Sequence, residues 1–182
     1  GSVFKVFNQA GFNGTTTTAI HQTITSFSLA EGSTVEYTRN GDQTITNASS
    51  VQYGNLVLSV SGIKTAPAST LTIRGNLDKT GNVSFAHNNG TVVMNGTSTQ
   101  AYTSSFPFMK FYNLNNNNTT GLFLNSEMSI EKQLGIGTSS KLTLQNGSNI
   151  ILLSSLSGTA NVSAVPAGAT VTYVGTGKFT VQ

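Results

Sequence analysis

The sequence repeats itself at a nearly constant interval, so that the stretch 33–77 returns in altered form at 90–134. The matching pairs 57 positions apart are Thr34 and Thr91, Val35 and Val92, Gln43 and Gln100, Thr46 and Thr103, Ile73 and Ile130, and Leu77 and Leu134. Pairs at 58 positions are Tyr53 and Phe111, Asn55 and Asn113, and Leu56 and Leu114, and pairs at 59 are Val83 and Leu142, and Phe85 and Leu144. Self-similarity at such a period is typical of repeat architectures. The slow drift indicates strands that keep their register and turns that vary in length.

The composition is that of a folded chain with few charges. Apolar residues make up 37% of the 182 positions, whereas Asp, Glu, Lys and Arg make up 8%, against roughly 25% in ordinary globular domains. The length suits a single domain with a sizeable core. The net charge is +3, but no basic stripe of the kind that binds nucleic acid is present. The chain has no cysteine and no long apolar run, so we expect no disulfide, no thiolate metal site and no insertion into a membrane.

Short apolar clusters that end in turn residues predict a long series of β-strands. Most alternate apolar with small polar residues, as in Leu71-Thr72-Ile73, which is the period of a half-buried strand. The predicted strands are 3–7, 22–29, 34–38, 43–46, 56–60, 70–74, 82–85, 91–95, 100–103, 110–113, 121–125, 141–145, 150–153, 170–174 and 178–181. Asn-Gly pairs such as Asn89-Gly90 could make tight antiparallel hairpins or the corners of a coiling chain. No stretch has a convincing helical pattern, and 125–134 is expected to be a strand because it repeats the strand around Ile73.

A long series of short strands can close as a sandwich, a barrel or a solenoid. The repeat favours a parallel β-solenoid, because stacked rungs bury like side chains over like, and a β-sandwich is the alternative. Roughly 20 residues per rung would give about nine rungs, three to each repeat. We expect matching residues, such as Val35 and Val92 or Ile73 and Ile130, to point inward on the same face of the rod. The four asparagines at 115–118 fit a bulge or an exposed corner better than a strand.

The phrases of the repeat also resemble a known pattern. They are Gly90-Thr-Val-Val-Met-Asn-Gly-Thr-Ser-Thr-Gln100, Phe111-Tyr-Asn-Leu114, Gly121-Leu-Phe-Leu-Asn125, Met128-Ser-Ile130 and Lys141-Leu-Thr-Leu-Gln-Asn-Gly147, with 33–43, 53–56 and 70–77 as earlier versions. Together they resemble the degenerate repeats of large secreted bacterial surface proteins that are similar to cargo of the type IX secretion route. The resemblance covers about 33–150 and implies a right-handed parallel β-helix in an adhesin-like or stalk-like exported protein. We therefore expect one domain over 1–182, with modules at 33–89 and 90–148, while 3–32 and 150–182 could form capping rungs.

Residues with catalytic or metal-binding chemistry are few and scattered. His21 and His87 have no further ligand at a suitable spacing, whereas a zinc site usually needs three or four. Glu36 and Asp42 could approach each other across adjacent corners, as the two carboxylates of a glycosidase must, but the second copy has no carboxylate at either position. No nucleophile lies in an activating motif. We therefore expect no enzymatic activity, no metal and no cofactor.

The aromatic residues around Pro107 are the best candidates for a binding site. Phe106, Phe108 and Tyr112 could form a glycan-binding surface, because a pyranose ring stacks on an exposed aromatic face while amides bind its hydroxyls. The favoured interpretation is structural, with Phe108 and Phe111 inside the solenoid and Tyr112 bracing a corner.

The sequence favours a structural function over a catalytic one. We expect a non-enzymatic stalk or fibre module of a secreted or cell-surface bacterial protein, and the alternative is a carbohydrate-binding or polysaccharide-processing β-helix. Neither terminal stretch has the polar character of a cap, which predicts end-to-end contacts with neighbouring modules or subunits.

Overall fold

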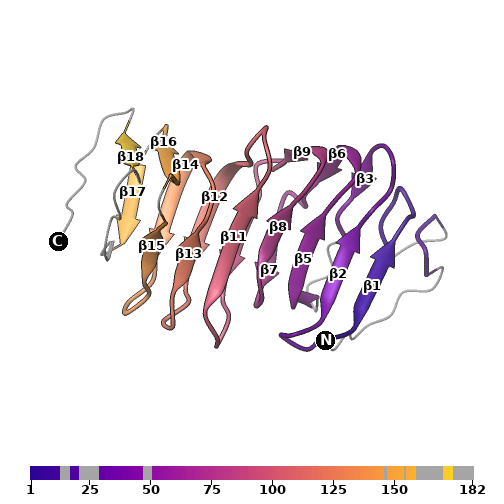
Figure 1. Ribbon diagram of the computed structural model, residues 1–182, viewed down its shortest axis with the longest axis horizontal. Helices are drawn as coiled ribbons and strands as arrows, with labels where there is room; N and C mark the ends of the chain where they lie inside the picture. Colours follow the sequence, from indigo (N-terminus) through magenta and orange to yellow (C-terminus); the bar gives the residue numbers. More distant parts are fainter. Residues whose placement is uncertain are drawn as a thin grey trace.

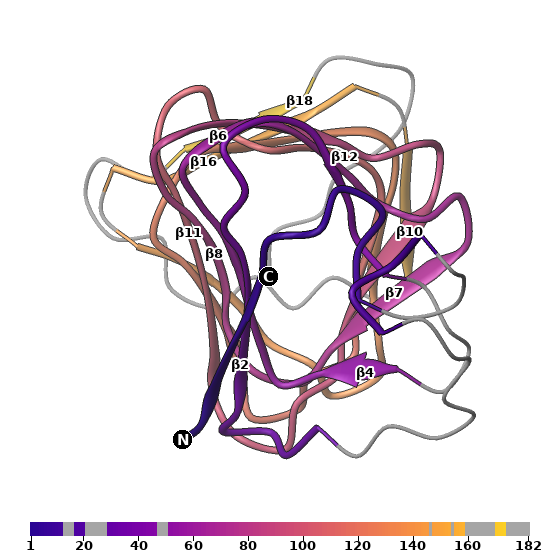
Figure 2. The same ribbon diagram turned by 90° about the vertical axis from the view of Figure 1, so that its right-hand side faces the viewer.

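The computed structural model describes residues 1–12, 17–20, 29–46, 51–145 and 147–153, together with the backbone of 155–158 and 170–173. Within these residues every regular element is a β-strand, and the strands lie side by side along one axis while the chain winds around it (Figures 1 and 2). Each strand pairs in parallel with the strands of neighbouring turns, and no described pair is antiparallel. The fold is therefore a parallel β-solenoid, and the β-sandwich alternative is wrong. Asn-Gly pairs such as Asn89-Gly90 form corners, not hairpins.

The coil has three faces. Face I consists of β1 (Val3–Val6), β2 (Thr34–Tyr37), β5 (Asn55–Leu58), β8 (Leu77–Lys79), β11 (Gln100–Ser104), β13 (Leu122–Leu124) and β15 (Leu142–Leu144). Face II starts with β3 (Gln43–Thr44), β6 (Ser61–Thr65) and β9 (Asn82–Ala86). Face III consists of β4 (Gln52–Tyr53), β7 (Thr70–Ile73), β10 (Thr91–Met94), the second halves of β12 (Lys110–Asn116) and β14 (Met128–Ile136), and β17 (Ser155–Gly158).

The long strands β12 and β14 each run over two faces. Strand β10 pairs only with residues 113–116 of β12, so the first half of β12 lies outside face III. The ring of Phe111 in that first half lies 5.6 Å from the ring of Phe85 in β9, which places it on face II. The first half of β14 pairs with the first half of β12, and β16 (Asn149–Leu152) and β18 (Thr170–Tyr173) continue face II.

From β2 onward, paired positions on face I are 20–25 residues apart, as in Thr34 with Asn55, Leu77 with Tyr102, and Leu124 with Leu144. These offsets give five complete turns between β2 and β15, with further strands on either side. The described strands thus form fewer turns than the roughly nine rungs expected, and part of the remaining chain lies outside the described residues. The strand predicted at 178–181, most of the one at 22–29, and His21 also lie outside them.

Inward side chains at the same height form columns along the axis. On face I one column consists of Val35, Leu56, Leu77, Tyr102, Leu124 and Leu144, and none of these residues is more than 2% exposed. A second column on face III consists of Leu71, Val92, Leu114 and Leu134. Full burial of one such side chain stabilises a fold by roughly 1.5–3 kcal/mol. Like residues stack on like, as the repeat predicts.

The repeat does not coincide with a whole number of turns. Val35 lies on face I and its counterpart Val92 on face III, while Ile73 lies on face III and Ile130 on face II. Counting faces along the chain, each matching pair is separated by two and two-thirds turns. All four side chains are buried, so the expectation that they point inward is confirmed. The expectation that they share a face is wrong, because about 21 residues complete a turn and 57 is not a multiple of that length.

Two glutamines of the repeat brace corners from inside. Gln100 Oε1 accepts the Gly96 N–H at 2.8 Å, and Gln100 Nε2 donates to the carbonyls of Ile73 and Gly75 in the preceding turn. Its counterpart Gln43 repeats the pattern, with Oε1 accepting from the N–H four residues earlier and Nε2 donating to two carbonyls of the preceding turn. The repeat therefore preserves a hydrogen-bonding role while moving it to a different face.

The asparagine run forms the expected exposed corner only in part, because Asn117 is exposed after the end of β12 whereas the residues on either side of it are buried. Asn116 belongs to β12, and both Asn116 and Asn118 are fully buried. Asn116 Nδ2 donates to the Lys141 carbonyl at 2.7 Å, and Asn118 Nδ2 donates to the Ser98 carbonyl at 2.7 Å and to Gln100 Oε1 at 2.9 Å. Burial of these amides is tolerated because each of them is hydrogen-bonded.

Two lysines also point into the solenoid. Lys64 Nζ donates to the carbonyls of Arg39 and Gly41 at 2.8 and 2.9 Å, and Lys79 Nζ lies 3.4 Å from Ser105 Oγ. Burial lowers the pKa of Lys64 to about 8 and also lowers the pKa of Lys79. Their aliphatic stems fill core positions while the ammonium groups reach the corners.

Candidate functional site

The two carboxylates considered for catalysis serve the stacking of turns. Glu36 accepts a hydrogen bond from Ser59 Oγ at 2.7 Å in the next turn and forms an ion pair of 3.5 Å with Lys5. Asp42 accepts the Ile63 N–H at 2.8 Å, also from the next turn. Among the described residues, no group of three His, Asp or Glu side chains could hold a metal ion.

The aromatic residues predicted as a glycan site lie at two different corners. Phe106 and Phe108 belong to the loop between β11 and β12, where face I meets face II, and their rings pack edge to face at 5.8 Å. Phe106 is 80% exposed and Phe108 is 37% exposed. The expectation that Phe108 lies inside the solenoid is therefore wrong. Phe111 does lie inside. Tyr112 comes after it, at the corner between faces II and III, and so the three predicted residues do not form one surface.

Tyr112 braces its corner, in agreement with the structural interpretation. Its ring stacks on His87 at 5.7 Å with an interplanar angle of 24°, and Lys132 Nζ lies 5.2 Å from its centroid. These contacts join residues from three successive turns. A ring with partners of this kind has little free face for a sugar.

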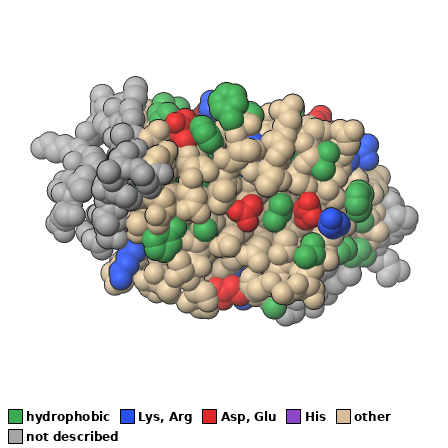
Figure 3. Space-filling model, in the orientation of Figure 1, with side chains coloured by type: hydrophobic (Ala, Val, Ile, Leu, Met, Phe, Trp, Pro, Cys, Tyr) green, Lys and Arg blue, Asp and Glu red, His purple; other side chains and the backbone are tan. Residues whose placement is uncertain are grey.

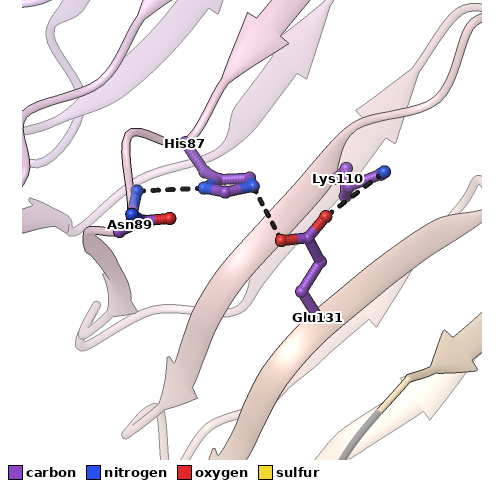
Figure 4. A network of polar contacts seen from close by, with 4 residues as sticks. All are labelled: His87, Asn89, Lys110 and Glu131. Atoms are coloured by element: carbon purple, nitrogen blue, oxygen red, sulfur yellow. Dashed lines mark hydrogen bonds and ion pairs between the residues drawn. The ribbon is translucent and has the colours of Figure 1, made fainter.

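A polar network extends from this corner (Figure 4). His87 Nδ1 accepts the Asn89 N–H at 3.0 Å, so the neutral imidazole carries its proton on Nε2. That nitrogen lies 3.2 Å from Glu131 Oε2, and Lys110 Nζ lies 3.2 Å from Glu131 Oε1. Glu131 is thus held between a histidine and a lysine, and the network ties β12 and β14 to the corner after β9.

The corner between faces III and I holds a pocket that the sequence did not reveal. Its lining residues are Glu31, Gly32, Asn55, Arg74, Gly75, Asn76, Ser98 and Thr99, and its volume is about 240 Å³. Four successive turns contribute, because these residues come just before or at the start of β2, β5, β8 and β11. We call this site the corner pocket.

The pocket exists because the corners differ in length. Only Gly54 separates β4 from β5, and residues 74–76 separate β7 from β8, whereas residues 95–99 separate β10 from β11. The two short corners form the floor, and the longer segments beside them form the walls. A Cβ on Gly75 would overlap the Asn55 side-chain oxygen, and one on Gly54 would overlap the carbonyls of Ala30 and Ser33. Glycine at these positions lets the short corners stack closely.

Glu31 links the two walls of the corner pocket across the short corners. Its Oε1 accepts the N–H groups of Thr97 and Ser98 at 2.8 and 3.0 Å, and its Oε2 accepts the Thr97 hydroxyl at 2.6 Å. The Thr97 hydroxyl, the two N–H groups and the charge of Arg74 together hold the pKa of Glu31 below its usual value. The carboxylate is therefore ionised at neutral pH.

Arg74 supplies the positive charge of the corner pocket. Its Nη2 donates to the Leu29 carbonyl, whereas its Nε is buried and has no hydrogen-bond partner among the described residues. Beside it, the Asn76 Oδ1 accepts the Ala101 N–H at 2.9 Å, which fixes the orientation of the amide. A carboxylate and a guanidinium thus share one pocket with amide and hydroxyl groups.

Comparison with known proteins finds no matching family, no matching characterised protein and no matching solved structure. Within the described residues no helix has the length and apolar character that a membrane span requires. The fold and the surface sites are therefore the basis for the functional proposals that follow.

Proposed function

We propose that this chain is a non-enzymatic structural or adhesive segment, a stalk or fibre module of a secreted or cell-surface bacterial protein. The main support is the parallel ladder of face I, which runs from β1 to β15 without an interruption in strand order. In such a stack each turn contacts mainly its neighbours, and length grows with the number of turns. This is the geometry of a spacer.

Side chains on the surface reinforce the ladder from turn to turn. Asn55 Nδ2 donates to Thr34 Oγ1 at 3.3 Å, and Asn55 Oδ1 accepts the Asn76 N–H at 2.8 Å. On another face Asn113 Nδ2 donates to Thr91 Oγ1 at 3.1 Å. The surface in Figure 3 is mostly uncharged, with isolated charged and hydrophobic side chains, as expected where amides and hydroxyls serve stacking.

Limited digestion with trypsin tests the structural role. Because Lys64 and Lys79 are buried, trypsin should not cut the native protein after either of them, while the protein in denaturant should be cut at both lysines. If trypsin cleaved after Lys64 or Lys79 as fast in native buffer as in denaturant, the proposal of a rigid spacer would be contradicted. Pectins, alginates and xylans should not be turned over, and a turnover abolished by Glu36→Gln or Asp42→Asn would overturn the non-enzymatic assignment.

Carbohydrate binding is the second candidate function, favoured by the exposed pair Phe106 and Phe108. An aromatic ring that is 80% exposed has a free face on which a pyranose can stack. A glycan array with the wild type and with Phe106→Ala tests this role, and Phe123→Ala on face I is the control for loss of a partly exposed phenylalanine. Equal glycan binding by all three proteins would rule out the aromatic pair.

A further inference from the structure

The corner pocket holds more hydrogen-bonding capacity than the protein uses. Among the contacts of the described residues, Asn76 Nδ2 and the hydroxyls of Ser98 and Thr99 have no protein partner. Glu31 Oε2 accepts a single hydrogen bond and has capacity for a second. Unused donors and an unused acceptor thus surround the same space.

The charges in the corner pocket favour a neutral ligand. A phosphate or carboxylate would approach Arg74 but would face the ionised Glu31, and an ammonium group would approach Glu31 but would face Arg74. A hydroxyl group donates and accepts at once, so it can donate to the carboxylate while accepting from the guanidinium or from the Asn76 amide. Hydrogen bonds to charged groups are about twice as strong as neutral ones.

The volume limits the ligand to one small unit. The corner pocket has a volume of about 240 Å³. Pockets for drug-sized ligands are larger, roughly 300–1,000 Å³. The space suits one sugar ring, such as a terminal residue of a longer chain.

We propose that the corner pocket binds a neutral saccharide unit, with vicinal hydroxyls bridging Glu31 and Arg74 and with Asn76, Ser98 and Thr99 completing the contacts. This site is separate from the Phe106 and Phe108 pair, and it does not depend on the stalk role of the solenoid. A spacer with such a pocket at one of its corners would also hold a glycan chain at that point.

The test is an NMR titration of the labelled full chain with methyl glycosides of glucose, galactose, mannose and N-acetylglucosamine. At least one should shift the amide signals of Gly75, Asn76, Ser98 and Thr99 in a saturable way. Glu31→Gln keeps an oxygen for the two N–H groups but removes the charge, and should weaken binding at least about tenfold. Ser98→Ala should weaken it less while leaving the fold intact.

The matched control is Glu127→Gln, which neutralises another surface carboxylate, one that accepts from Asn149 Nδ2 at 3.1 Å. This variant should bind like the wild type. The proposal is overturned if no glycoside shifts the pocket signals or if binding survives Glu31→Gln. It is also overturned if only ligands with charged groups bind, for which glucuronate and free glycine are the probes. Shifts confined to the loop of Phe106 and Phe108 would overturn the pocket while supporting the aromatic pair.

Discussion

Replacing Gln100 with methionine would show how much the buried corner amides contribute to stability. Two groups would lose the only partner they have among the described hydrogen bonds, namely the Gly96 N–H, which donates to Gln100 Oε1 at 2.8 Å, and the Gly75 carbonyl. Both glycines are buried, so water cannot take over. At about 1–3 kcal/mol for each unpaired group, Gln100→Met should lower the free energy of unfolding by about 2–6 kcal/mol.

The counterpart Gln43 provides a matched comparison with the same chemistry. Its Oε1 accepts from the N–H of Arg39, an exposed residue that water can reach. The carbonyls of Val6 and Asn8, to which its Nε2 donates, each accept a second N–H from the backbone. Gln43→Met should therefore cost only about 1 kcal/mol, the net value of an ordinary hydrogen bond.

Urea unfolding followed by circular dichroism measures both variants, with the slope of the transition compared as well as its midpoint. Comparing slopes matters because stacked turns can unfold in parts. Amide exchange at Gly96 gives a local readout and should accelerate only in Gln100→Met. If the two variants lose equal stability, unpaired backbone groups do not determine the cost and the reasoning is refuted.

Ile130→Asp buries an unpaired charge and should lower the free energy of unfolding by about 3–5 kcal/mol. Ser129→Asp, on the outer side of β14, should change it by less than about 0.5 kcal/mol. Similar melting temperatures for the two variants would contradict the assigned faces. Raising the pH from 8 to about 9.5, below the range in which tyrosines of the unfolded chain ionise, should stabilise the protein. Burial lowers the pKa of Lys64 to about 8, so the folded state releases this proton before the unfolded state does. Lys64→Met should weaken the rise, and a fall in its place would be contrary evidence. The Thr97 hydroxyl is the main cause of the lowered pKa of Glu31. The contacts between Glu31 and Thr97 should therefore stabilise the fold above pH 4.5 and be lost as the pH falls through that lowered pKa. Amide exchange of Thr97 should accelerate in that pH range in the wild type, but not in Glu31→Gln.

The sequence repeat predicted which residues point inward, but not where on the solenoid they lie. Val35, Val92, Ile73 and Ile130 are all buried as expected. Their faces could not be predicted, because apolar alternation fixes the side of a strand and says nothing about how many residues complete a turn. Turn length depends on the corners, which are short or long without a clear signal in composition.

The missed strands show the same limit at a local level. Strand β6 begins with Ser61-Gly62, which resembles a turn, and strand β8 is three residues long. Each also has a lysine at an inward position, Lys64 in β6 and Lys79 in β8. A charged residue argues against burial in a sequence pattern, and only the solenoid geometry shows that the ammonium group can reach carbonyls or a hydroxyl at a corner.

The candidate sites depended even more on three-dimensional stacking. The aromatic cluster around Pro107 was visible in the sequence, but the inward residues Met109 and Phe111 separate its members into two corners. Glu31 and Arg74 are far apart in sequence and lie in one pocket because two short corners sit between longer ones. No spacing rule for ordinary motifs connects them.

The mismatch between the repeat period and the turn length also determines the directions in which equivalent outward residues face. Because matching positions are two and two-thirds turns apart, an outward residue of one module and its counterpart in the next face directions about a third of a revolution apart. A third module of the same period would cover the remaining direction. Weak attachment points distributed in this way can engage a surface from any side, and several can act together to raise the overall avidity. A period equal to whole turns would instead align every copy along a single stripe, and would leave two sides of the rod bare.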